Sequence, residues 1–190
     1  MKQIRSALLV FLVLTIITGL MYPIFVTAFA RIFFPYEASG SLIIKNGAVI
    51  GSSLIGQSFE DPKYFWGRLS ATSPVPYNAS NSSGSNIGPV NPVLRQSIES
   101  RMKTLKDADP GNRDPIPVDL VTSSASGLDP HISIAGALYQ AGRVARSRGI
   151  SESVVQNRIR KNTQGRFLGL VGEPVVNVLR LNIALDELKS

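Results

Sequence analysis

The stretch SALLVFLVLTIITGLMYPIFVTAFA, residues 6–30, decides the fold class, because its 25 residues include no charged side chain. A helix rises about 1.5 Å per residue, so this stretch would span roughly 37 Å. That length crosses a hydrocarbon core of about 30 Å with some tilt. The sequence therefore predicts a membrane anchor at residues 1–34, with a transmembrane helix over about residues 7–30.

A cleaved signal peptide is the alternative interpretation of this N-terminus. Lys2 and Arg5 form a basic region before the apolar stretch, and Ala28-Phe29-Ala30 resembles a signal-peptidase site. The apolar stretch is long for a signal peptide, however. Arg31 and the aromatic residues after it are typical of a helix end at the membrane interface. These features favour an anchor that stays attached.

Small and weakly polar residues interrupt the apolar stretch. Thr15, Thr18 and Gly19 are either simply tolerated in lipid, or they form a face that packs closely against partner helices. Pro23 is expected to bend the helix or to mark the start of a looser end, because proline donates no backbone hydrogen bond.

Charges on the two flanks of the helix indicate its orientation. The N-terminal flank carries the amine, Lys2 and Arg5, whereas Glu37 offsets part of the positive charge that follows the helix. Because cytoplasmic flanks are enriched in Lys and Arg, this pattern favours a cytoplasmic N-terminus. Residues 35–190 would then form an extracytoplasmic domain, attached to the cell (inner) membrane by a single pass.

The composition excludes several classes of site. The chain has no cysteine and one histidine, His131, so disulfides, thiolate metal sites and multi-histidine metal sites are excluded. Ser126, Asp129 and His131 lie too close together in the sequence for a hydrolase triad. No Gly-Lys pair occurs, which excludes the common phosphate-binding loop. The sequence thus predicts neither a catalytic site nor a metal site.

Basic residues give the chain a net charge of +7 and cluster between residues 143 and 166. The solvated faces of two helices would explain such a cluster, and the alternative is a docking face for an anionic partner or lipid. No aromatic residues interleave the cluster, so binding to nucleic acid is not expected. The cluster consists of Arg143, Arg146, Arg148, Arg158, Arg160, Lys161 and Arg166.

The sequence after the anchor predicts a mixture of short strands and helices. Asn46-Gly47 between two apolar runs predicts a hairpin over residues 41–50. Residues 73–91 are rich in Pro, Ser, Asn and Gly, and a loop of this length is usually functional or disordered. The class is therefore α+β, with one transmembrane helix followed by one small mixed α/β soluble domain. Other strands are expected at residues 118–121 and 175–178, and helices at residues 92–106, 129–149, 151–164 and 181–188.

The loop at residues 123–127 is the candidate binding feature. Its sequence, SSASG, offers hydroxyls and backbone amides, and Asp129-Pro130 is expected to start the next helix. Backbone amides at a helix N-terminus bind anions, although a structural turn would also explain these small residues.

Several longer stretches carry a resemblance that covers the whole chain in order. They are TGLMYP (18–23), GSSLIGQSF (51–59), YFWGRLSAT (64–72), PYNASNSSGSN (76–86), PVDLVTSSASGLDPHIS (117–133), RVARSRG (143–149) and GEPVVNVLRLNIALD (172–186). Together they resemble the KdpC family, the small accessory subunits of Kdp potassium-transporting ATPases.

The resemblance implies a non-catalytic subunit of a high-affinity, ATP-driven potassium uptake complex. Its partners would be a P-type ATPase subunit, a channel-like potassium-binding subunit and a small single-helix subunit, all in the lipid bilayer. The subunit would assemble and stabilise this complex and raise the affinity of the ATPase subunit for ATP. No firmly bound cofactor is implied, and ATP would be contacted through the complex by Ser124, Ser126, Gly127 and Gln140.

A stand-alone membrane-anchored extracytoplasmic binding domain is the alternative function. Stable co-purification with large membrane partners separates the two hypotheses, because only the accessory subunit requires such partners.

Overall fold

The computed structural model describes residues 2–189 and divides the chain into two compact units, which meet between Ser52 and Ser53. The N-terminal unit contains a long apolar helix and a hairpin, and the C-terminal unit contains four further α-helices and a small sheet. The predicted α+β class, with one long N-terminal apolar helix, is confirmed.

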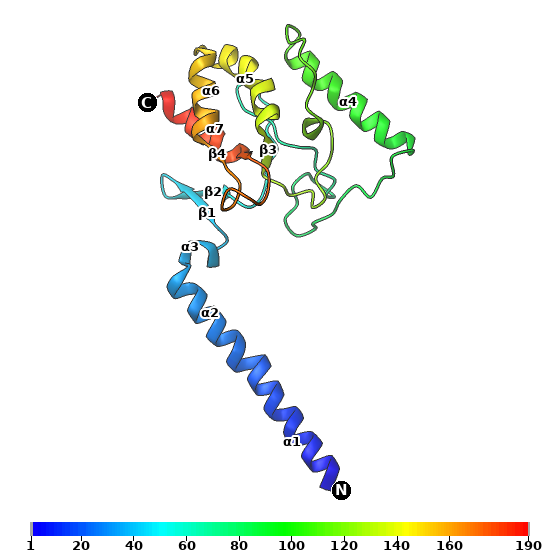
Figure 1. Cartoon of the computed structure of the whole chain (residues 1–190), viewed down its shortest axis with the longest axis vertical. Helices are drawn as coiled ribbons and strands as arrows, with labels where there is room; N and C mark the ends of the chain where they lie inside the picture. Colours follow the sequence, from blue (N-terminus) through cyan, green and yellow to red (C-terminus); the bar gives the residue numbers. More distant parts are fainter. Residues whose placement is uncertain (1, 190) are drawn as a thin grey trace. The chain divides into compact units, whose positions relative to one another are not determined.

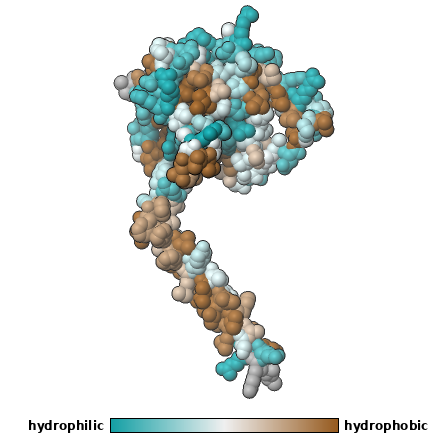
Figure 2. Space-filling view, viewed as in Figure 1, coloured by the Kyte–Doolittle hydropathy of each residue, from teal (hydrophilic) through white to brown (hydrophobic). Residues whose placement is uncertain are grey.

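The apolar helix is built from α1 (Lys2–Ile16), a π-helical turn (Ile17–Met21) and α2 (Tyr22–Phe33), and it is drawn in blue in Figure 1. Its membrane-compatible part, Gln3–Phe33, has 31 residues, which corresponds to about 46 Å. No side chain in this span is buried within the described part of the chain, and Figure 2 shows apolar residues along most of it. The expected span of 7–30 lies inside this helix.

The π-helical turn lies directly before Pro23. The N–H of Tyr22 donates to the carbonyl of Ile17, five residues back, so one extra residue is accommodated in this turn. Pro23 has no N–H to donate to Gly19, and this missing bond explains why the helix widens there. The expectation of a looser end after Pro23 is wrong, because α2 continues as a regular α-helix to Phe33.

The predicted hairpin is present in the N-terminal unit. A short helix, α3 (Pro35–Ala38), precedes β1 (Leu42–Lys45), which pairs antiparallel with β2 (Ala48–Ser52). Asn46 and Gly47 have φ angles of 52° and 78°, as a tight turn between twisted strands requires. The turn chemistry of this dipeptide was therefore sufficient to predict the element.

The C-terminal unit surrounds an antiparallel three-stranded sheet in the order β3-β5-β4. The strands are β3 (His131–Ser133), β5 (Val175–Asn177) and β4 (Thr163–Gln164). Helices α5 (Ile134–Arg148), α6 (Glu152–Lys161) and α7 (Val178–Asp186) pack consecutively on one another. Helix α4 (Pro92–Ala108) follows the long loop at residues 73–91 in the sequence. Short 3-10 turns occur at Val118–Leu120 and Glu187–Lys189. The core includes Phe65, Leu120, Ile132, Ala137, Val144, Val155, Ile159, Val176, Leu181 and Leu185.

The start of α5 differs from the prediction, which placed it at Asp129-Pro130. Residues 131–133 instead pair with β5, and the helix begins at Ile134. The Ser133 Oγ accepts a 2.8 Å hydrogen bond from the Gly136 N–H, so Ser133 is the N-cap. Asp119 fixes this cap, because its carboxylate accepts hydrogen bonds from the Ser133 N–H and hydroxyl.

Two other element predictions need correction. Residues 118–121 were expected to form a strand, but Val118–Leu120 form a 3-10 turn that positions Asp119 against the cap of α5. The last helix begins at Val178 rather than residue 181, because the Asn177 side chain caps it by accepting from the Arg180 N–H.

Arg143 and Arg148 were expected on solvated helix faces, yet both are buried.

Candidate functional site

The predicted binding loop, residues 123–127, is paired with the segment that contains Arg68 and Leu69. Leu69 and Ser123 form a parallel bridge, and the Ser124 N–H donates to the Leu69 carbonyl over 3.3 Å. The Ser70 hydroxyl donates to the Gly127 carbonyl over 2.7 Å. The loop is therefore an integral part of the packed unit.

The long loop at residues 73–91 is fastened to the same structure. The Ser83 N–H and the Ser82 hydroxyl each donate to the Ser126 carbonyl over 3.0 Å. The Tyr77 hydroxyl donates to the Arg68 carbonyl over 2.6 Å, and burial raises the pKa of this phenol. These contacts join Tyr77, Ser82 and Ser83 of the long loop to the rest of the C-terminal unit.

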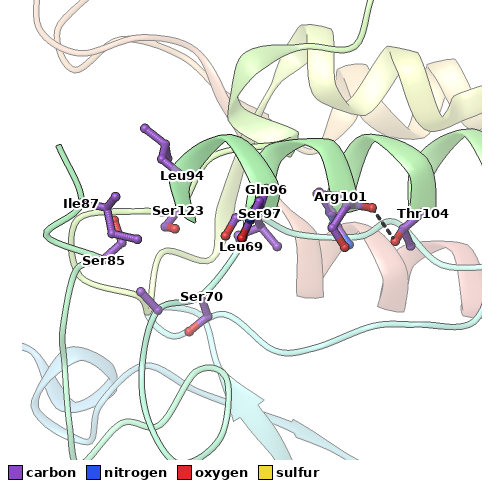
Figure 3. A pocket seen from close by; sticks show the side chains of 12 residues that line it. Leu69, Ser70, Ser85, Ile87, Leu94, Gln96, Ser97, Arg101, Thr104 and Ser123 are labelled. Atoms are coloured by element: carbon purple, nitrogen blue, oxygen red, sulfur yellow. Dashed lines mark hydrogen bonds between the residues drawn. The ribbon is translucent and has the colours of Figure 1, made fainter. Parts of the chain in front are cut away.

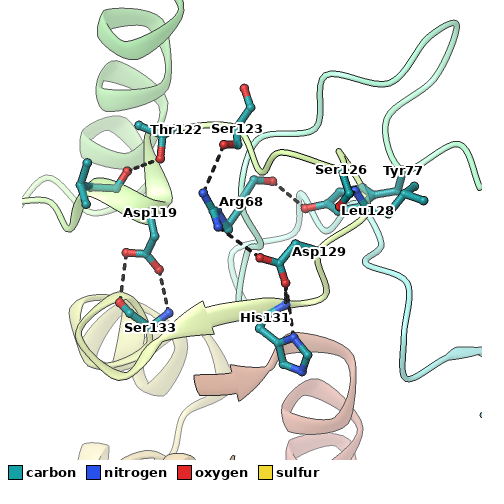
Figure 4. A network of polar contacts seen from close by, with 11 residues as sticks. Arg68, Tyr77, Asp119, Thr122, Ser123, Ser126, Leu128, Asp129, His131 and Ser133 are labelled. Carbon is teal, nitrogen blue, oxygen red and sulfur yellow. Dashed lines mark hydrogen bonds and ion pairs between the residues drawn. The ribbon is translucent and has the colours of Figure 1, made fainter. Parts of the chain in front are cut away.

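An ion-pair network lies behind the 123–127 loop (Figure 4). Arg68 contacts Asp129 over 3.1 Å and donates to the Ser123 carbonyl over 3.2 Å. Asp129 also accepts from the His131 N–H over 3.0 Å. Burial alone would raise the pKa of the Asp129 carboxyl, but the His131 hydrogen bonds and the Arg68 charge outweigh burial and hold the pKa below its ordinary value. Asp129 is thus a carboxylate at neutral pH, and it joins the loop to β3.

The polar groups of the predicted nucleotide-contacting loop are bonded mostly to neighbouring segments of the chain. Ser124 is buried, and its N–H is bonded to Leu69. The Ser126 hydroxyl accepts from the Leu128 N–H over 3.1 Å, and the Gly127 N–H donates to the Ser124 carbonyl. Because α5 starts at Ile134, the positive end of a helix dipole does not follow this loop directly. The helix-start argument for anion binding is therefore wrong.

The side chain of Gln140 forms its hydrogen bonds with residues outside that loop. Its side chain is 1% exposed, its Oε1 accepts from the Trp66 N–H over 2.9 Å, and its Nε2 donates to the Trp66 carbonyl over 3.1 Å. Arg143 also donates to Oε1 over 2.7 Å. Among the described residues, the hydrogen bonds of Gln140 go to these groups and to the Gly136 carbonyl, not to residues 123–127. The structure brings Ser124, Ser126 and Gly127 together and does not join Gln140 to them.

A second buried amide performs the same task and was missed from the sequence. The Asn182 Oδ1 accepts from the Phe65 N–H over 2.8 Å, and its Nδ2 donates to the Phe65 carbonyl over 3.0 Å. Gln140 on α5 and Asn182 on α7 thus act as side-chain substitutes for a neighbouring strand along Phe65-Trp66. We call these two residues the amide clamp. The available signal was an asparagine flanked by Leu181 and Ile183 in the sequence LRLNIAL of the last helix.

Arg143, on the same helix as Gln140, contacts the ring of Trp66. Its guanidinium lies 4.3 Å from the centre of the Trp66 ring and donates to the Pro62 carbonyl. Burial lowers the pKa of Arg143 to about 10, which leaves it charged at neutral pH. The buried charge is therefore held by a carbonyl, an amide and an aromatic face.

A groove of about 720 Å³ lies between α4 and the segments that contain Leu69, Ser85 and Ser123 (Figure 3). Its walls are rich in hydroxyls, including those of Ser97, Ser100 and Thr104 on α4. Arg101 also lines it, but its guanidinium donates to the Gly67 and Leu120 carbonyls and holds α4 in place. Among the described residues, no group of three or more His, Cys, Asp or Glu side chains is placed to hold a metal ion. The hydroxyls of the groove can form hydrogen bonds with a polar surface.

These features define a class of protein. A single helix that is long and apolar enough to cross a membrane is joined to an α+β unit, in which Arg68, Gln140 and Asn182 hydrogen-bond to the backbone of loop segments. The model of the KdpC family, described as K+-transporting ATPase, c chain, matches residues 4–187. The chain therefore belongs to the KdpC family.

Relatives of similar length support this membership. A protein of Methylococcus capsulatus named potassium-transporting ATPase KdpC subunit is 58% identical, and the match covers 99% of each chain. Proteins with the same name from Sorangium cellulosum and Herpetosiphon aurantiacus are 56% and 57% identical. These matches cover 98% of this chain, and 98% and 96% of the two relatives.

Proposed function

We propose that this chain is the accessory subunit of a high-affinity, ATP-driven potassium uptake complex, which it assembles and stabilises without catalysis of its own. Its partners are a P-type ATPase subunit, a channel-like potassium-binding subunit and a small single-helix subunit. The names of the relatives, each a KdpC subunit of a potassium-transporting ATPase, support this proposal.

The long apolar helix is the observation that carries the proposal. None of its side chains from Gln3 to Phe33 is buried in the described chain, so they are available to lipid and to helices of other subunits. The π-helical turn places small residues in the middle of the span, and a Cβ added at Gly19 would meet no atom within 4 Å. The Thr18 hydroxyl donates to the Leu14 carbonyl over 2.7 Å, so it needs no other partner in lipid. Such a surface permits close approach of a second helix.

Gly19→Leu is expected to weaken the assembled complex. Leucine would occupy the space into which a partner helix packs, and overpacking of this kind costs about 1–3 kcal/mol, or roughly tenfold in association. The measurement is a pull-down of C-terminally tagged chain in mild detergent, with mass spectrometry of the recovered partners. Ala7→Leu also introduces a leucine, adding three carbons instead of four, away from the π-helical turn, and should leave recovery unchanged.

Equal recovery of partners with both variants would place the helix interface elsewhere. Recovery of the unsubstituted chain alone, under conditions that keep other membrane complexes intact, would favour the alternative of a stand-alone anchored binding domain.

The same proposal places the N-terminus in the cytoplasm and the C-terminal unit outside, supported by the positive charges of Lys2 and Arg5. The chain has no cysteine, so a single introduced thiol reports the topology. Val90→Cys replaces a side chain that is 96% exposed, and it should react in intact cells with a maleimide that cannot cross the inner membrane. Labelling only after that membrane is disrupted would reverse the proposed orientation.

A contribution to ATP affinity through Ser124, Ser126, Gly127 and Gln140 stays a prediction that rests on the family resemblance alone. An external C-terminal unit would be separated by the membrane from cytoplasmic ATP. Assembly and stabilisation are therefore the functions that we favour.

A further inference from the structure

The loop between β4 and β5, drawn in orange to red in Figure 1, exposes a cluster of large apolar side chains. Phe167, Leu168, Leu170 and Val171 are 72, 81, 82 and 66% exposed. None of the four belongs to the hydrophobic core of the described residues. Exposed apolar residues that are concentrated in this way indicate an interaction surface, whereas single ones do not. We call residues 167–171 the apolar tip.

The backbone holds the apolar tip in a defined shape. The Phe167 N–H donates to the Val171 carbonyl over 2.8 Å, and the Val171 N–H returns a 3.1 Å bond to the Phe167 carbonyl. Leu168 has a φ angle of 52°, in the left-handed region that residues other than glycine rarely adopt. Strain of this kind persists only where the surrounding structure enforces it, and it concentrates at functional sites. The backbone of the apolar tip is thus held by its own hydrogen bonds, and its apolar side chains are exposed.

Basic residues border the apolar tip in the sequence. Residues 157–180 contain five basic side chains and one acidic side chain, Glu173. Arg166 pairs with Glu173 over 3.1 Å, while Arg160 and Lys161 at the end of α6 are exposed. Apolar side chains beside positive charge are the chemistry by which a surface segment binds a bilayer with anionic headgroups.

The strand that follows the apolar tip, β5, ends beside the point where the chain enters the C-terminal unit. The Asn177 Nδ2 in β5 donates to the carbonyl of Ser53, the first residue of this unit, over 2.8 Å. Residues 35–52 join Ser53 to the apolar helix and reach at most about 60 Å when fully extended. The tether therefore keeps the apolar tip at a high effective concentration near the bilayer.

We propose that the apolar tip inserts into the interfacial layer of the bilayer in which the chain is anchored, with Arg160 and Lys161 on anionic headgroups. This second contact fixes the orientation of the C-terminal unit on the membrane. It goes beyond the accessory function, because it needs no other subunit. An apolar socket on a partner protein would not require the basic border, which is why lipid is the occupant that we favour.

The absence of cysteine allows one probe to test this contact in the full chain. Leu168→Cys carries a polarity-sensitive fluorophore after reconstitution into vesicles of phosphatidylcholine with phosphatidylglycerol. The matched control is Val118→Cys, which replaces a side chain that is 72% exposed on the 3-10 turn before the 123–127 loop. We expect a blue-shifted emission at position 168 and several-fold stronger quenching by nitroxide-labelled lipids than at position 118.

The charge contribution is tested by Arg160→Glu with Lys161→Glu in the Leu168→Cys background. Each basic residue adds about fivefold to binding at an anionic surface, so quenching at position 168 should fall markedly. Equal quenching at positions 168 and 118 overturns the proposal, and this result does not depend on whether the chain assembles with partner subunits. Protection of position 168 that arises only in the purified complex also overturns it, and it assigns the apolar tip to a protein socket.

Discussion

Gln140→Ala is expected to lower the free energy of unfolding of the C-terminal unit by about 2–4 kcal/mol. The substitution leaves the buried N–H and carbonyl of Trp66 without their side-chain partner, and it removes an acceptor from the Arg143 guanidinium. A buried backbone group without a partner costs about 1–3 kcal/mol, and two such groups are created at once. Trp66 is the only tryptophan in the chain, so its fluorescence reports unfolding from beside the substituted residue.

The control for this experiment is Gln96→Ala. Gln96 is exposed on α4, so its truncation should change the unfolding midpoint very little. Asn182→Ala should reproduce the large effect, because it deprives Phe65 of the same pair of bonds. A stability equal to that of the unsubstituted chain in both clamp variants would show that Phe65-Trp66 does not depend on the amide clamp.

The same Gln140→Ala variant separates the structural role from the predicted nucleotide role. If Gln140 contacts ATP, the assembled complex should bind ATP more weakly even at temperatures where the variant is fully folded. If the amide clamp is its whole role, ATP titration of the folded complex should give an unchanged apparent affinity. The two readouts, unfolding midpoint and ATP affinity, move independently, so each hypothesis can fail without the other.

The elements that the sequence predicted well are those set by local chemistry. The apolar helix follows from a run of residues without charge, and the hairpin follows from Asn46-Gly47, whose positive φ angles suit a tight turn. The helix predicted at residues 92–106 begins at Pro92, and Asn91 is its N-cap, with the Val93 N–H donating to the Asn91 Oδ1 over 2.9 Å. Each of these signals is contained within a few residues.

The errors arose where contacts between distant residues decide the local structure. Asp129-Pro130 has the residue types of a helix start, but pairing with β5 extends the backbone through Ser133. Asp119, fourteen positions earlier, then fixes Ser133 as the cap. The sequence offers both Asp129 and Ser133 as N-cap candidates. Only the pairing of β3 with β5 shows that Ser133 is the one used.

The candidate site was predicted only in part for the same reason. Ser124, Ser126 and Gly127 are neighbours in sequence and therefore remain neighbours in space. Gln140 was attached to them by resemblance, whereas its bonds to Trp66 span 74 positions. The role of Asn182 depends on contacts over 117 positions and leaves almost no local signature.

Gly127→Ala is expected to detach the long loop from the 123–127 loop and to cost about 2–4 kcal/mol in total. Gly127 has a φ angle of 68°, and an added Cβ would lie 2.6 Å from the Ser83 carbonyl oxygen and 2.6 Å from the Thr72 Cγ2. The carbonyl belongs to the backbone and cannot rotate away. The hydrogen bond from the Ser83 N–H to the Ser126 carbonyl must therefore break. The left-handed conformation of an alanine at position 127 adds about 1–2 kcal/mol to the cost.

Hydrogen–deuterium exchange of the full chain in detergent measures this effect where it arises. Peptides that cover residues 77–86 should exchange faster in Gly127→Ala, while those from α5, α6 and α7 should change little, because the core lies outside the substituted contact. Gly88→Ala is the matched control, since a Cβ there meets no atom within 4 Å and its φ angle is not positive. Gly88→Ala should leave exchange unchanged or slow it slightly, because alanine restricts the unfolded chain more than glycine does and so stabilises the fold. Equal exchange over residues 77–86 in the two variants would mean that the long loop is held independently of Gly127, and the contact from Ser83 to Ser126 would then not be what orders it.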